Sequence, residues 1–563
     1  MTLEPLESRT LLAVGLSGVP DWMEQGPGPI EANVIGTATG AIESIAIHPT
    51  EPIALIGGSN GGIWRTMDIS VATPAWEPLG DQLESLSIRT VAFSPLDPST
   101  VYAGSGRSSA GFGDGGATAG LFRSTDLGDT WTQLARSQLL GLTIRHVVPT
   151  GFLDPLTNQE VVLIAASGGS NSGGVFRSDD AGETFTRISG DGAPGNALPG
   201  VNVTQVVADP STPGQYFVGV PFVGVFRSID YGVTWQTMSN GITDITPQSF
   251  SIDMAVHSSP GNSVIYAAVT RNDQSLPAPF NARTNRMSSL WRTTDGGQNW
   301  RQVQNMLVVN PGAQGGLHFS MVAHPTDPNV VFLGGDAPVP DDGAGGLNPF
   351  PNSYMSRYRV TMDDGTPAND TWTPTTDFNA SGTRPHADAR DAVFDSNGNL
   401  IEVDDGGIYR LVDPDSANRQ WEPLNGNLRL TEFFSVAYDS LNDTLFGGTQ
   451  DNGTPRQRAT SDPLYPLSWS TAQGADGGVA GVDNDQAAHP GSTLIFTVSQ
   501  NLGGFTRRVI DNTNAQVSTA GLGVVASTNG NNIQGLENAV LNPNGTRGTL
   551  LYMTPYAVNA VAP

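Results

Sequence analysis

The chain has 563 residues, no cysteine, and 54 acidic against 27 basic residues, all of the latter arginine, for a formal net charge of −27. Such a charge repels nucleic acid and anionic membranes, and a chain without cysteine forms neither disulfides nor thiolate metal sites. The 68 glycines and 40 prolines favour short strands joined by turns, and the absence of any run of 18 apolar residues predicts no membrane-spanning helix.

The N-terminal residues 1–13 lack the basic start and the long apolar stretch of a secretory signal. Residues 3–12 instead resemble the Leu-Glu-Pro-Leu-Glu-x-Arg-x-Leu-Leu tag (the LEPR-XLL motif), which precedes many large extracellular proteins of certain bacteria. The resemblance implies export, and therefore an extracellular or cell-surface location; an ordinary frayed terminus is the alternative. Residues 14–40 are rich in glycine and proline and are expected to form a lead-in.

One short stretch, called the box from here on, recurs along the chain. Its four copies cover residues 120–131, 174–185, 224–235 and 290–300. Their central aspartates, Asp126, Asp180, Asp230 and Asp295, are separated by 54, 50 and 65 residues. Repetition at this period predicts a propeller or a solenoid.

Each box combines a strand, a tight turn and a returning strand. An apolar pair and an arginine end the first strand, Ser-x-Asp-x-Gly forms the turn, and Thr followed by an aromatic residue starts the return. The aromatic ring has a large area to bury against a neighbouring unit. The box positions are Ser124, Asp126, Gly128, Thr130 and Trp131; Ser178, Asp180, Gly182, Thr184 and Phe185; Ser228, Asp230, Gly232, Thr234 and Trp235; and, in the loosest copy, Asp295, Gly297 and Trp300.

This pattern resembles the Asp-box (BNR) repeat of β-propellers. In that family the box is a structural hairpin at the periphery of a blade, so the resemblance implies that these aspartates build the fold and do not catalyse. We therefore predict an all-β propeller.

From residue 41 onward the chain shows about nine and a half similar units, each with two apolar strands before the box position. The order of the units resembles the tandem seven-bladed xyloglucanase-type glycosidases, which implies a seven-bladed propeller over residues 41–425 and part of a second, apparently truncated, over 426–563. The alternative is a single ten-bladed ring, as in sortilin-like propellers, but those rely on cysteine-rich modules that this chain lacks.

The glycosidase resemblance also implies where catalytic acids belong. In that family two aspartates, one from the first blade of each propeller, lie in Asp-x-Gly-Gly motifs and act as general acid and base. Here residues 59–62 read Ser-Asn-Gly-Gly, with serine in place of the first acid, and residues 450–453 read Gln-Asp-Asn-Gly, with the acid shifted by one. The best match is Asp404-Asp405-Gly-Gly, but it lies in the seventh unit. The candidate catalytic residues are Asp404, Asp405 and Asp451; alternatively, the first two cap a Gly-Gly turn and the third braces its own loop.

Two further stretches carry polar side chains with possible ligand chemistry. His386, Asp388, Arg390 and Asp391 precede a strand of unit seven, where they could meet a metal or a substrate or simply form hydrogen bonds at the strand end. Residues 395–399 resemble the start of a calcium loop without its closing glutamate, and as a hairpin turn they need no ion. We expect no metal and no cofactor.

Three functional hypotheses follow. The main one is a secreted or cell-surface propeller that binds glycans or proteins through the loops at the mouth of its channel, without catalysis. The alternative is a glycoside hydrolase, a xyloglucanase-like endo-glucanase with paired aspartates, and the third is a structural segment of a larger surface protein. A polysaccharide or a surface protein is the expected partner; the sequence leaves the oligomeric state open.

Overall fold

The computed structural model describes residues 23–32, 35–106, 115–258, 263–272, 285–340, 349–350, 352–500 and 503–522. Beyond these it describes only the backbone of β39 (Val525–Thr528), β40 (Asn531–Gln534), β41 (Val540–Leu541) and β42 (Arg547–Gly548). The export-type tag over 1–13 lies outside the described residues. In the described part, no helix is both long and apolar enough to cross a membrane.

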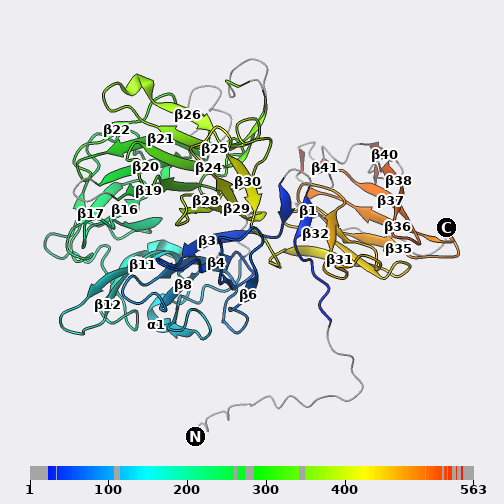
Figure 1. The fold of residues 1–563 in the computed structure, drawn as a ribbon, viewed down its shortest axis with the longest axis horizontal. Coiled ribbons are helices and arrows are strands. Elements are labelled where there is room, and N and C mark those ends of the chain that lie inside the picture. Colours follow the sequence, from blue (N-terminus) through cyan, green and yellow to red (C-terminus); the bar gives the residue numbers. More distant parts are fainter. Residues whose placement is uncertain are drawn as a thin grey trace, which may run out of the picture.

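Between residues 42 and 423 the chain forms seven four-stranded antiparallel sheets in sequence order (Figure 1). Their strands are β3 (Ile42–Ile47), β4 (Ala54–Gly58), β5 (Ile63–Thr66) and β6 (Trp76–Pro78); β7 (Ile88–Phe93), β8 (Val101–Ser105), β9 (Leu121–Ser124) and β10 (Thr132–Leu134); β11 (Thr143–Leu153), β12 (Glu160–Ser167), β13 (Gly174–Ser178) and β14 (Thr186–Arg187); β15 (Gln205–Ala208), β16 (Tyr216–Val220), β17 (Gly224–Ser228) and β18 (Gln236–Thr237); β19 (Ser249–His257), β20 (Val264–Arg271), β21 (Arg286–Thr293) and β22 (Arg301–Gln302); β23 (Ser320–Ala323), β24 (Val330–Val339), β25 (Tyr354–Thr361) and β26 (Thr371–Pro374); and β27 (Asp391–Phe394), β28 (Leu400–Asp404), β29 (Gly407–Val412) and β30 (Gln420–Pro423). Helical turns are short: α1 (Arg136–Leu139), η1 (Gly169–Asn171) and η3 (Pro367–Asn369).

The seven sheets close on themselves. The first strand of each sheet packs on the first strand of the next, and β27 of the last sheet packs on β3 of the first. The backbone N–H of Ile45 donates to Asp391 Oδ2 across this closure at 3.2 Å, and Ile42 shares one apolar cluster with Ile401 and Val403. We call residues 42–423 the ring. The prediction of an all-β propeller is confirmed; the division at residue 425 stays a prediction.

A second group of strands follows the ring and lies beside it in Figure 1. We call it the C-terminal sheets. One has the order β2-β1-β34-β33-β32-β31, and the other runs β35-β36-β37-β38. Strand β1, from the lead-in, pairs in parallel with β34, so the N-terminal segment joins a sheet built from residues more than 400 positions later. The bounds are β1 (Ile30–Ala32), β2 (Gly36–Ala38), β31 (Phe433–Asp439), β32 (Thr444–Thr449), β33 (Pro455–Gln457), β34 (Trp469–Thr471), β35 (Gly481–Asp483), β36 (Ser492–Thr497), β37 (Thr506–Asp511) and β38 (Gln516–Gly521).

The boxes form the turns between the third and fourth strands of four sheets, from β9 to β10, β13 to β14, β17 to β18 and β21 to β22. In the first copy Asp126 accepts hydrogen bonds from Ser124 Oγ at 2.7 Å and from Thr130 N and Oγ1 at 2.9 and 2.6 Å. Gly128 has φ 101°, a left-handed conformation that glycine adopts without strain. The fourth copy keeps these bonds with threonine and asparagine at the flanking positions.

The box aromatics differ in burial. Trp235 has no exposed surface, and its indole N–H donates to the carbonyl of Gly232 at 3.0 Å. Phe185 and Trp300 are also buried. Trp131 is only half-buried, and its indole nitrogen has no hydrogen-bond partner in the described part of the chain. The four rings therefore do not contribute equally to packing between sheets.

Candidate active site

The candidate aspartates lie where the last sheet of the ring meets the first C-terminal sheet. Asp405 follows β28 in the turn into β29, and Asp451 lies in the turn after β32, where its φ is 54°. The side-chain amide of Asn452 donates to the backbone carbonyl of Asp405 at 3.1 Å. The structure thus brings Asp405 and Asp451 together, and their carboxyl groups form a hydrogen bond.

The side chain of Asp404 lies in different surroundings from that of Asp405, because successive side chains along a strand point to opposite faces. Its side chain is fully buried, and its Oδ1 accepts the backbone N–H of Gly406 at 2.9 Å. Burial, reinforced by the charge of Glu402, raises the pKa of Asp404 well above its usual range. No contact between Asp404 and Asp451 is found among the described residues, so Asp404 caps the Gly-Gly turn.

Asp405 is held by Arg390, which precedes β27. The guanidinium contacts both carboxylate oxygens, Nε with Oδ1 and Nη2 with Oδ2 at 3.0 Å, and its third nitrogen contacts Glu43. Burial by itself raises the pKa of Asp405, but the charge of Arg390 outweighs it and lowers that pKa to about 2. Asp405 is therefore ionised at neutral pH.

Asp451 has the opposite electrostatic environment. Burial raises the pKa of its carboxyl group well above the usual value, and the negative charges of Asp405, Asp476 and Asp388 raise it further. Asp476 Oδ1 accepts the backbone N–H of Asp451 at 2.8 Å, and the side-chain amide of Gln450 donates to Asp451 Oδ2 at 2.8 Å. The raised pKa favours the protonated form of Asp451 beside the ionised Asp405.

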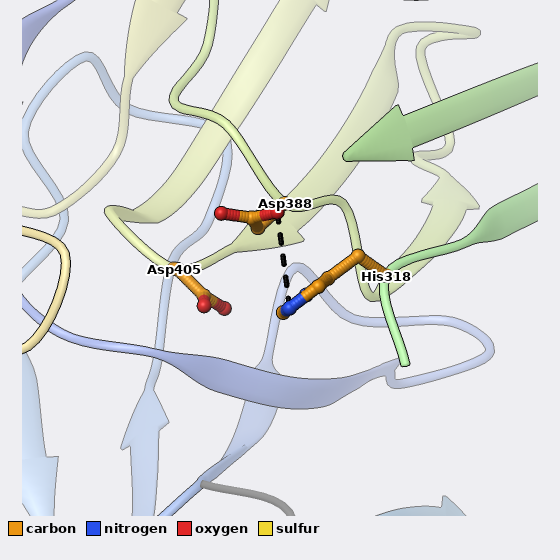
Figure 2. A group of neighbouring side chains, drawn as sticks. All are labelled: His318, Asp388 and Asp405. Carbon is orange, nitrogen blue, oxygen red and sulfur yellow. Dashed lines mark ion pairs between the residues drawn. The ribbon is translucent and has the colours of Figure 1, made fainter. Parts of the chain in front are cut away.

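A histidine and two aspartates surround the same point (Figure 2). Ligand atoms of His318, Asp388 and Asp405 all lie within 4.8 Å of one another, and His318 Nε2 is 3.8 Å from Asp388 Oδ1. Such groups can coordinate a cation. Arg390 already contacts both oxygens of Asp405, however, and supplies positive charge there. The expectation of no metal stays a prediction.

Several residues of this cluster were not identified from the sequence. Asp476 begins an Asp-Gly-Gly run of its own, which is a signal that could have revealed it. His318 comes from the segment before β23 and is close to the others only in the fold. Burial lowers the pKa of His318 to about 3, so its imidazole is neutral.

The position that the resemblance assigns to the first acid holds neutral side chains. Ser59 Oγ donates to Glu43 Oε1 at 2.7 Å, and Asn60 Nδ2 donates to Glu432 Oε2 at 2.7 Å. The remaining candidate, His386, lies against Gly406; its backbone carbonyl accepts a hydrogen bond from Arg357. Residues 395–399 form the hairpin turn between β27 and β28, in which Asp395 accepts the backbone N–H groups of Asn397 and Asn399.

The chain is similar to xyloglucanases. The xyloglucanase Xgh74A of Acetivibrio thermocellus is 26% identical over an alignment of 340 residues that covers 48% of this chain and 39% of that protein. A probable oligoxyloglucan-reducing end-specific xyloglucanase of Neosartorya fischeri is 26% identical over 208 residues, 36% of this chain and 24% of that protein. The chain thus spans well under half the length of these curated relatives. No protein-family model matches it.

Solved structures show the same fold. An ancestral GH74 enzyme superposes with a TM-score of 0.59 at 15% identity, covering 89% of this chain and 63% of that one. The GH74 enzyme of Niastella koreensis superposes with a TM-score of 0.50 at 16% identity, covering 88% and 74%. The similarity to curated xyloglucanases favours the glycoside hydrolase alternative over the main hypothesis of a propeller that only binds glycans.

Proposed function

We propose that this chain is a glycoside hydrolase that acts on xyloglucan or a closely related β-glucan. The observation that carries the proposal is the contact between Asp405 and Asp451, whose surroundings shift the pKa values of the two carboxyl groups in opposite directions. Acid–base cleavage of a glycosidic bond requires two carboxyl groups with different pKa values, one protonated and one ionised.

In this proposal Asp451 is the general acid. Its raised pKa keeps a proton available near neutral pH, and transfer of that proton to the glycosidic oxygen makes the departing sugar a neutral alcohol. The carboxylates of Asp405 and Asp476 beside it hold the proton on Asp451 until the substrate oxygen arrives.

Asp405 is the ionised partner. Arg390 keeps it charged, so it can stabilise positive charge on the sugar ring or accept a proton from water. An inverting pair of carboxyl groups stands roughly 6.5–9.5 Å apart, with water between them. Because Asp405 and Asp451 are in hydrogen-bond contact, the two groups must separate when a substrate enters.

The proposal also covers the substrate class, the domain organisation and the location of the protein. The similarity to xyloglucanases supports the substrate class. The seven sheets that close on themselves support a propeller over 41–425, with 426–563 forming part of a second. An extracellular or cell-surface location fits a polysaccharide substrate and the N-terminal resemblance.

The test is release of reducing ends from xyloglucan by the full chain and by Asp451→Asn and Asp405→Asn. Each substitution should lower the rate by a factor of about a hundred or more while xyloglucan binding persists, as removal of a general acid or base does. Asp395→Asn is the control, because Asp395 lies in the hairpin turn of the same sheet. Unchanged rates in both site variants would reject the assignment.

A second candidate is a propeller that binds the same polysaccharide without cleaving it. The observation that favours it is the neutral pair Ser59 and Asn60 at the position of the first acid. In that case xyloglucan binds to the wild-type chain, but no reducing ends appear after prolonged incubation.

A further inference from the structure

A second pocket opens on the ring, away from the aspartates. Its volume is about 360 Å³, within the range of about 300–1,000 Å³ typical of small-molecule sites. It lies over the third, fourth and fifth sheets, and its lining includes Arg145, Ser167 and Phe222. Like Asp405, Ser167 and Phe222 stand at or just after the end of the second strand of a sheet. The pocket is therefore on the same face of the ring as the candidate active site.

Arg145 is the pocket's charged residue, and among the described residues it lacks the carboxylate partner that two neighbouring arginines have. Arg89 and Arg390, which line the adjoining channel, both contact Glu43. Arg145 forms no ion pair with any described residue, and its one protein hydrogen bond is from Nε to Ser167 Oγ at 3.3 Å. A guanidinium has five N–H donors in a planar fork that fits a carboxylate, so most of its binding capacity is unused here.

The electrostatic surroundings of Arg145 favour a bound anion. Burial, followed by the like charge of Arg89, lowers the pKa of Arg145 to about 10. The group remains charged at neutral pH, and the more distant carboxylates of Asp253 and Glu43 offset its burial only in part. A bound carboxylate would compensate through two parallel N–H···O bonds.

Phe222 forms the rim of the pocket. The residue is 52% exposed, and its φ of 65° is rare for a bulky residue. Two hydrogen bonds fix this conformation: Phe222 N donates to Ser249 O at 2.7 Å, and Val223 N donates to Val220 O at 3.1 Å. Strain of this kind gathers at binding sites. The fold thus holds an aromatic ring in solvent beside a cationic pocket, where it can cover the apolar face of a sugar.

We propose that this pocket binds a uronic acid residue of a polysaccharide, with Arg145 holding its carboxylate and Phe222 stacking on its ring. The net charge of −27 disfavours a polyanion. The occupant is therefore an isolated uronate on an otherwise neutral chain. The inference does not rest on hydrolysis.

The experiment is calorimetric titration of the full chain with two oligosaccharides, a xylotetraose that carries one glucuronic acid branch and the same xylotetraose without it. The acidic oligosaccharide should bind at least about tenfold more tightly, the gain expected of a charge-assisted hydrogen-bonded pair. Equal affinities for the two, or no binding of the acidic one, would overturn the proposal. Acetate is titrated as well, and acetate binding as tightly as the acidic oligosaccharide would mark a simple anion site and also overturn it.

Two variants locate the site. Arg145→Gln should abolish the preference for the acidic oligosaccharide, and Arg123→Gln is the control, because Arg123 pairs with Glu183 on the outer turns. Phe222→Asn should weaken the binding of both oligosaccharides. The turn should be preserved, since asparagine tolerates a left-handed φ. Thermal unfolding confirms that each variant is folded. A preference that persists in folded Arg145→Gln would contradict the assignment.

Discussion

Asn452 links the two parts of the molecule by donating its side-chain amide to the backbone carbonyl of Asp405 at 3.1 Å. Asn452 belongs to the turn after β32, and Asp405 to the turn between β28 and β29. The bond fixes the turn that carries Asp451 against the turn that carries Asp405. The position of the acid relative to its ionised partner therefore depends on the junction between the ring and the C-terminal sheets.

Asn452→Ala should lower xyloglucan hydrolysis without unfolding the chain. One lost hydrogen bond to a buried carbonyl costs about 1–3 kcal/mol, a small part of what holds the ring together. We expect the rate to fall at least severalfold, because the two carboxyl groups lose their alignment. The check is the rate measured beside the thermal midpoint; a normal rate in a folded variant would show that the bond does not position the pair.

Trp235→Ala should destabilise the protein by about 3–5 kcal/mol, as expected for removal of a fully buried aromatic side chain. Trp131→Ala should cost clearly less, because this ring is half-buried and its N–H has no partner in the described chain. Denaturant unfolding of both variants measures the difference. Equal losses would mean that Trp131 is as tightly packed as Trp235.

Asp391 should make stability depend on pH. Its burial raises the pKa to about 6 in the folded protein, from about 3.8 in the unfolded chain. The folded state therefore keeps a proton that the unfolded state releases, so this contribution to stability is present below pH 3.8 and is lost as the pH rises to about 6.

Asp391→Asn removes this titration. The thermal midpoint of the variant minus that of the wild type should be more positive at pH 7.5 than at pH 4, whatever the constant effect of the substitution. Thermal unfolding at the two pH values gives the comparison. A difference that does not change with pH would show that Asp391 does not titrate in this window.

Local chemistry explains what could be predicted from the sequence. The box is a short-range turn whose serine, aspartate, glycine and threonine hydrogen-bond one another, so its hairpins follow from spacing alone. Four copies at intervals of 50 to 65 residues then indicate a propeller. The expected capping role also describes Asp404, which bonds to the turn two residues ahead.

The candidate site depends on contacts that spacing does not encode. Asp405 and Asp451 belong to different units, and the fold alone brings Asp476 and His318 beside them. The lead-in strand β1 is a similar case, since its pairing with β34 has no local signal. The separation of the pKa values of Asp405 and Asp451 arises from burial and from Arg390, and neither can be read from the local sequence.

The most direct test of the proposed acid and base is the dependence of kcat/KM on pH, measured on xyloglucan from pH 3 to pH 9. We expect kcat/KM to be flat across the acidic range, because Asp405 stays ionised down to its pKa of about 2. The rate should then fall on the alkaline side as Asp451 loses the proton that its raised pKa retains. A rate that rises with pH throughout, or no release of reducing ends at any pH, would contradict it.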